Sequence, residues 1–204
     1  DQAPPIAIEI MPYLIVFILF FSFLCPSLSA NMPDDILLEA DHISYLKNDE
    51  VIEASQNVTL LYKDLKAKMD YFRYDFVSKQ LDIPHSFVLS SHDNLFRANQ
   101  LSYNFNSQIG YAQNYYFSSN EISSQGRTLF FYPNKLSIRH GYYSACTSFP
   151  PHYRIVSERM EIYPYRGVLV SKRNALLIPF LPFKIPIPYF LYSGKDKTNT
   201  HVDF

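Results

Sequence analysis

Apolar and polar residues alternate along the middle of the chain with the period of a β-strand. Leu101, Tyr103 and Phe105 alternate with polar neighbours, and after an Asn-Ser-Gln turn signal the alternation resumes with Ile109 and Tyr111. Side chains two positions apart on a strand lie on the same face. We therefore predict two antiparallel strands whose five apolar residues share one face.

A second pattern places an aromatic residue five positions after an alanine, and three copies of it lie within residues 40–103. The copies are Ala40 with Tyr45, Ala67 with Phe72, and Ala98 with Tyr103. Turn-forming Asn and Asp residues separate strand-like segments at roughly 8–12-residue intervals, which is typical of all-β proteins. A single hairpin cannot bury its apolar face, so such units stack in a row and share a core. The sequence thus predicts an all-β protein built from antiparallel strand pairs.

The two ends of the chain differ in character from the strand-like middle. An apolar run over 13–24 is shorter than the roughly 20 residues that a membrane-spanning helix needs, and small residues follow it. This pattern predicts a secretory signal peptide that starts at Met11 and is cleaved after Ala30, with an uncleaved membrane anchor as the alternative. Near the other end, 178–190 is apolar and carries four prolines, which favours an edge strand or an extended connector.

These patterns divide the chain into four parts. We expect upstream residues and a signal segment over 1–30, stacked β-units over 31–132, their continuation over 133–177, and a proline-rich connector over 178–204. Export would remove two acidic residues and change the net charge from −1 to +1. A charge this close to zero gives no electrostatic reason to expect a nucleic-acid partner.

The composition supports a packed core but offers no catalytic motif. Hydrophobic residues make up 48% of the chain and aromatic residues 17%. Among the potential metal ligands, only His140, Cys146 and His152 lie close together, each six positions from the next. A zinc site needs about four ligands, so we predict no metal site. Because the sequence has no catalytic motif, we also predict no cofactor and no enzymatic activity.

The aromatic stripe in the middle of the chain has two interpretations. It is either the closed core of a β-sandwich or the lining of a groove that accepts hydrocarbon. Apolar burial stabilises by about 25 cal/mol per Å² whether the partner is a side chain or a lipid chain. The candidate lipid-binding residues are Leu101, Tyr103, Phe105, Ile109, Tyr111, Tyr115 and Phe117.

Several segments, taken in order, carry a family resemblance. Residues 38–45 (Leu-Glu-Ala-Asp-His-Ile-Ser-Tyr) and 53–60 (Glu-Ala-Ser-Gln-Asn-Val-Thr-Leu) resemble the A-D-x-x-x-Y … A-x-G-N-V signature of OstA-like lipopolysaccharide-transport proteins, the LptA and LptD type. Residues 95–110 resemble a later copy. Residues 142–155 resemble the Y-T-x-C … P-x-W-x-I segment that closes the periplasmic domain of the LptD type. Residues 178–194 resemble the lead-in to the β-barrel of that type.

The resemblance implies a fold, a function and partners. The fold would be a twisted β-jelly roll, the periplasmic N-terminal domain of an outer-membrane assembly protein, whose oily interior shelters lipid A acyl chains. Partners would be lipopolysaccharide, other Lpt-type β-rolls joined by edge-strand addition, a β-barrel that follows in the same protein, and an outer-membrane lipoprotein. Cys146 resembles the family cysteine that forms a disulfide with the N-terminal region. Gln56 and Tyr153 depart from the family pattern, which has Gly and Trp there.

Three alternatives stay open at this point. A stand-alone periplasmic bridge of the LptA type shares the expected fold, although the segment around Cys146 and the proline-rich tail argue against it. A β-solenoid enzyme that acts on polysaccharides would need paired carboxylates on one sheet and more regular repeats. A structural surface protein would have the aromatic stripe as closed core.

Overall fold

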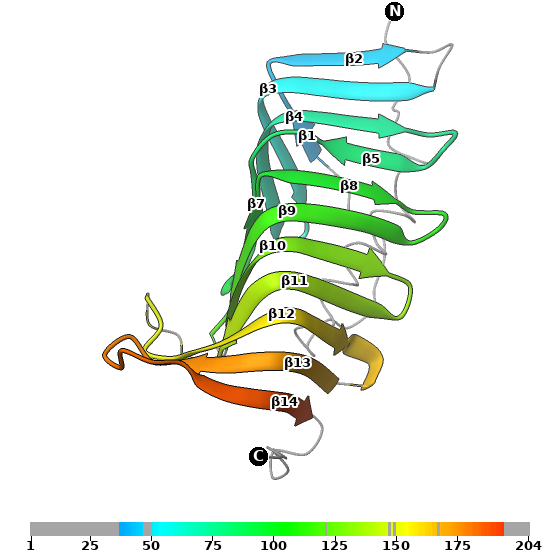
Figure 1. Cartoon of the computed structure of the whole chain (residues 1–204). Coiled ribbons are helices and arrows are strands. Elements are labelled where there is room, and N and C mark those ends of the chain that lie inside the picture. Colours follow the sequence, from blue (N-terminus) through cyan, green and yellow to red (C-terminus); the bar gives the residue numbers. More distant parts are fainter. Residues whose placement is uncertain are drawn as a thin grey trace, which may run out of the picture.

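The computed structural model describes most of the chain between residues 37 and 193. The described residues are 37–46, 50–120, 122–146, 148, 150–166 and 168–193. The predicted signal segment over 1–30 and its cleavage site therefore lie outside the described residues. Within the described part, the prediction of an all-β protein is confirmed, because fourteen antiparallel strands form one sheet (Figure 1).

The strands are antiparallel and mostly follow chain order across the sheet, although some neighbours are two or three strands apart in the sequence. A short 3-10 helix, η1 (Pro164–Arg166), lies between the twelfth and thirteenth strands. Their bounds are β1 (Leu37–Glu39), β2 (His42–Leu46), β3 (Val51–Tyr62), β4 (Leu65–Asp75), β5 (Gln80–Ile83), β6 (Phe87–Ser91), β7 (Asn94–Ala98), β8 (Gln100–Asn104), β9 (Ile109–Ser118), β10 (Ser123–Tyr132), β11 (Lys135–Ser144), β12 (Arg154–Tyr163), β13 (Val168–Leu177) and β14 (Ile185–Ser193).

Each long strand is bent near its middle, so that the sheet folds into two wings (Figure 1). The first half of β3 pairs with β2 and the second half with β1. In the same way β4 pairs with β5 and β6, and β9 with β8 and β7. The fourteen strands thus form eleven bent rungs, because three rungs are split into two short strands. We call the half-rungs aligned with β2, β5 and β8 the first wing, and those aligned with β1, β6 and β7 the second wing.

The bend arises where two consecutive side chains point outward. In β9, Ala112 and Tyr115 are buried while Gln113 and Asn114 between them are exposed. This step breaks the period-2 alternation, so both halves of the strand turn their apolar residues to the same inner side. Asn114, His140 and Arg173 adopt left-handed φ angles of 48°, 49° and 56° at the bends of alternate rungs. We call this line of bends the corner.

The corner explains the repeated spacing of alanine and aromatic residues. Residues five apart on a regular strand would face opposite sides, yet Ala67 and Phe72 are both buried in the inner core. They lie on either side of the exposed Asp70 and the half-buried Tyr71. Ala98 and Tyr103 are likewise both buried, on either side of the break between β7 and β8. In these two copies the spacing therefore spans the bend of a rung.

One part of the face assignment is wrong. Ile109 is 49% exposed on the outer face of the sheet, and Tyr111 is half-buried there. The turn pairs Asn104 with Ile109, so even-numbered residues of β8 lie opposite odd-numbered residues of β9. Leu101 consequently shares its inner face with Ala112, its partner in the ladder. The alternation predicted both strands correctly, but the register of the turn decides which residues of the second strand face inward.

Among the described residues, the sheet has an end rung on each side. At one end β1 and β2 pair with β3 alone of the described strands, and at the other β14 pairs with β13 alone. Pro186 and Pro188 fit this edge position because proline has no N–H to donate to a further strand. The tail predicted as an edge strand or a connector is thus an edge strand over Ile185–Ser193. The ladder runs without a break across residue 133, where a second section was expected.

Candidate functional site

The inner faces of the two wings form one buried apolar cluster, to which every long strand contributes side chains. Five of the seven predicted lipid-binding residues are buried on this inner lining, which we call the trough. Leu101, Tyr103 and Phe105 come from β8 and the turn after it, and Tyr115 and Phe117 from the second half of β9. Ile109 and Tyr111 do not contribute to the trough, for the reason of register given above.

Aromatic rings in the trough contact one another along each wing. In the first wing, Phe105 lies 6.0 Å from Tyr74 and 4.9 Å from Tyr103, whose ring lies 5.8 Å from Phe131. These pairs are edge-on, an arrangement that the ring quadrupoles favour. In the second wing, rings of neighbouring rungs also pair, at 5.9 Å between β6 and β7 and at 6.1 Å between β7 and β9. Each wing thus carries an aromatic ladder that runs along the stack.

Other rungs supply trough residues that were not singled out from the sequence. They are buried and belong to the same cluster: Ala54, Val58, Leu60, Phe72, Phe87, Leu89, Phe96, Leu129, Leu136, Ile138 and Met160. The sequence contains a signal for some of them, because Val58, Leu60 and Tyr62 are apolar at every second position. Leu101, Tyr103 and Phe105 show the same spacing. What the sequence did not reveal is that all rungs contribute to a single lining.

A buried pair of hydroxyl groups lies in the apolar lining near the corner. The Tyr115 hydroxyl lies 2.9 Å from the Ser124 hydroxyl, which in turn donates to the Tyr142 carbonyl at 3.0 Å. Burial raises the pKa of the Tyr115 phenol far above its ordinary value, so this group stays protonated and donates to Ser124. The phenol is therefore satisfied within the fold and offers no acid or base to a substrate.

The described residues do not suggest a metal centre or a membrane-spanning helix. Within the described ranges, no group of three or more His, Cys, Asp or Glu side chains is arranged to hold a metal ion. His140 lies on the outer corner and is exposed. Among the helical residues that the structure describes, none belongs to a segment with the length and apolar character to cross a bilayer.

Two of the three potential metal ligands do come together. The Cys146 sulfur lies 3.3 Å from His152 Nδ1, and the backbone N–H of Cys146 donates to the Ser144 hydroxyl at 3.1 Å. Cys146 forms no disulfide with any described residue. Hydrogen bonds from the backbone of His152 and then of Ser148 lower the pKa of the thiol to about 7. This cysteine is thus partly a thiolate at neutral pH, the form that attacks disulfides and electrophiles.

Alkylation of Cys146 by iodoacetamide is expected to reach half its maximal rate near pH 7. The rate should fall as the pH drops below that value, because the thiolate is protonated, and should level off above it. Mass spectrometry of the peptide that contains Cys146 measures this without interference from Cys25. In 8 M urea the midpoint should return to about 8.5, the value for a free cysteine. A folded-state midpoint near 9 would show that these hydrogen bonds do not act on the sulfur.

Comparison with known proteins adds no name to this site. No family model matches the chain, and no curated protein matches its sequence. The resemblance to OstA-like proteins accordingly stays a prediction. What the described geometry offers is an apolar lining that is continuous along a bent sheet.

Proposed function

We propose that this protein carries an amphipathic lipid, lipopolysaccharide, through the trough between its two wings. The observation that carries the proposal is the continuity of the apolar lining across all long rungs. Ten spacings of about 4.8 Å between eleven rungs give a trough about 48 Å long. The hydrocarbon core of a whole bilayer is about 30 Å thick, so the trough is longer than one acyl chain. Acyl chains would lie inside while the sugar head stays in water.

Entry of a lipid would take place on the side opposite the corner. The backbone joins the two wings at the corner, whereas on the other side each wing ends in its own row of turns, such as 76–79 in the first wing and 92–93 in the second. The ring contacts of the aromatic ladders are made within each wing. The two rows of turns could therefore move apart without breaking these contacts. Burial of each Å² of acyl-chain surface would then stabilise the complex by about 25 cal/mol.

The exposed end rungs support a role in a series of β-sheet proteins. Ile43, Tyr45 and Leu46 of β2 are about half exposed on the rung that ends the stack. An unpaired edge presents backbone N–H and C=O groups to which a further strand can add. We propose that rolls of similar build in the periplasm join at these edges, and that the chain works there or at the outer membrane without catalysis. Directional transport would then depend on an energy source in another protein.

A structural scaffold is the second candidate, and a specific observation favours it. Leu101 and Tyr115 are 1% and 2% exposed, so parts of the trough are closely packed. In this interpretation the lining is ordinary core and binds no ligand. A scaffold and a carrier differ in whether a lipid reaches the inner side chains, and this can be measured directly.

A photo-crosslinking amino acid such as p-benzoylphenylalanine at Tyr103 or Phe105 is expected to capture lipopolysaccharide. The same probe at the outward-facing Tyr111 is the matched control, because Tyr111 lies on the neighbouring rung with its ring on the opposite face. Crosslinks from the inner positions alone would support the carrier. Crosslinks from Tyr111 alone, or none from a protein whose circular dichroism is unchanged, would reject the carrier and favour the scaffold.

A further inference from the structure

The loop between β13 and β14 exposes large apolar side chains at its tip. Phe180 is 76% exposed and Phe183 is 59% exposed, and Leu181 beside them is also exposed. The loop spans 178–184 and projects beyond the folded sheet (Figure 1). A backbone hydrogen bond of 3.0 Å from Leu181 N–H to the Ile178 carbonyl closes a turn within it. We call residues 178–183 the apolar loop.

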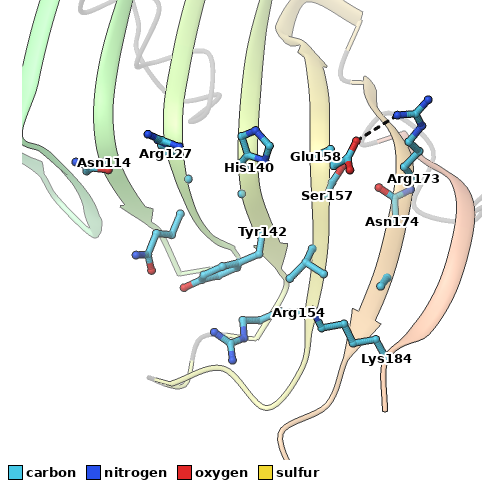
Figure 2. Close-up of a pocket in the computed structure, with 15 residues that line it drawn as sticks. Asn114, Arg127, His140, Tyr142, Arg154, Ser157, Glu158, Arg173, Asn174 and Lys184 are labelled. Carbon is cyan, nitrogen blue, oxygen red and sulfur yellow. Dashed lines mark hydrogen bonds and ion pairs between the residues drawn. The ribbon is translucent and has the colours of Figure 1, made fainter. Parts of the chain in front are cut away.

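A groove rich in positive charge begins at the base of this loop. It has a volume of about 660 Å³ and lies on the outer face of the second wing next to the corner (Figure 2). Its cationic side chains are Arg127, Arg154, Arg173 and Lys184, with His140 between them. The acidic side chain in its lining is Glu158, which lies 3.4 Å from Arg173. We call this surface the basic groove.

The fold itself gathers these cations from four separate segments. Arg127 and Arg173 occupy the exposed positions of the corner on β10 and β13, where two successive residues point outward. Arg154 begins β12, and its guanidinium lies 5.3 Å from the centre of the Tyr142 ring. The Nε atom of Arg154 is buried and has no hydrogen-bond partner. Lys184 is the residue that directly follows the apolar loop.

Two cations of the basic groove differ from those on the first wing close by. Lys135 and Arg159 both bind Glu161, at 2.9 and 2.7 Å, and this lowers the pKa of that carboxyl to about 2. Within the described residues, by contrast, the side chains of Arg127 and Lys184 have no ion-pair or hydrogen-bond partner. A surface that leaves several cations without counter-charges attracts anions.

We propose that the apolar loop and the basic groove together dock this end of the protein on an anionic lipid surface. Phe180 and Phe183 would enter the boundary between headgroups and acyl chains, and the groove cations would bind lipid phosphates. Exposed aromatic residues next to cations are the combination that anionic membranes bind. A soluble phosphate would use the cations but would leave both phenylalanines in water. The inference concerns the outer face and does not depend on what the trough carries.

A single tryptophan in the apolar loop tests this proposal, because the chain has none of its own. In the full chain, F180W fluorescence is expected to shift to shorter wavelength with vesicles of phosphatidylcholine and phosphatidylglycerol at 7:3, and brominated lipids should quench it. The control is V77W, which places tryptophan at another exposed position (68% exposed) on the turn after β4. This local readout is needed because the apolar segment 13–24 could bind vesicles by itself.

The groove is tested in the F180W background. Replacing both Arg127 and Arg154 by alanine is expected to weaken binding to the anionic vesicles at least tenfold, given roughly fivefold for each cation near such a surface. E158Q should strengthen binding, because it removes the negative charge of the groove. K66A, which changes an exposed lysine of β4 away from the groove, should have little effect.

Three results would overturn the proposal. Tryptophan at position 180 could remain as exposed to water as that at position 77, which would exclude insertion. It could already be shielded without vesicles, which would mean that protein covers the loop. Binding could be equal for neutral and anionic vesicles or unaffected by the double arginine change, which would exclude the groove. F183W repeats the test if F180W does not fold.

Discussion

Replacement of Leu101 by alanine is expected to lower the free energy of unfolding by about 3 kcal/mol. Leu101 is 1% exposed and lies in the inner core at the centre of the stack, where β8 pairs with both β5 and β9. The change removes buried apolar surface and leaves a cavity that a bent sheet, held by ladders on both sides, cannot collapse to fill. Urea denaturation followed by circular dichroism measures the effect.

The matched control for this prediction is the change of Ile109 to alanine on the neighbouring rung. Its side chain is on the outer face and about half exposed, so the loss should stay within about 0.5 kcal/mol. Comparable losses at the two positions would contradict the register in which Leu101 pairs with Ala112. The pair of variants therefore tests the face assignment directly, without a ligand.

Replacement of Gly141 by alanine is expected to destabilise the fold by about 2 kcal/mol. Gly141 pairs with Gly126 of β10 at the corner. A Cβ atom there would lie 2.7 Å from the Gln125 carbonyl oxygen and 2.7 Å from the Ile138 side chain. Because the first of these is a backbone atom in the sheet ladder, relief of the clash requires the two rungs to move apart. Urea denaturation again measures the change.

Gly126 provides the comparison for this second prediction. A Cβ at Gly126 meets the Tyr115 ring at 2.8 Å, and a ring edge can yield more readily than a ladder carbonyl. We therefore expect a smaller loss for G126A than for G141A. If an added Cβ at position 141 met no clash, alanine would stabilise the protein by about 0.4–1 kcal/mol, because it lowers the conformational entropy of the unfolded chain. A gain in stability for G141A would thus contradict the close approach of rungs at the corner.

The corner links the fold to both proposals. Two successive outward residues on each rung turn the apolar halves of the strand toward one another, which creates the trough. The same step places extra polar side chains on the outside, and on the later rungs these include Arg127, His140 and Arg173. The bend therefore supplies part of the basic groove, and the start of β12 and the loop before β14 supply Arg154 and Lys184.

Sequence patterns alone determined the secondary structure of this protein. The alternation around Leu101 and Tyr103 predicted strands, because it depends on local backbone periodicity. The three alanine-to-aromatic spacings predicted repeated strand units, although only the structure shows that the spacing spans a bend. The prolines near the C-terminal end predicted an edge strand or an extended connector, since proline cannot donate to a further neighbour, and the structure has an edge strand over Ile185–Ser193. Alternation also placed five of the seven candidate trough residues on the inner face correctly.

Only the tertiary structure decided which residues share a face and which segments meet. The faces of Ile109 and Tyr111 depend on the register of a turn, and one residue of shift moves every side chain to the other side of the sheet. The contact between Cys146 and His152 depends on the path of a loop between β11 and β12. The basic groove unites residues from four segments that are far apart in the sequence. No local pattern encodes these contacts, because they arise from the stacking and bending of the rungs.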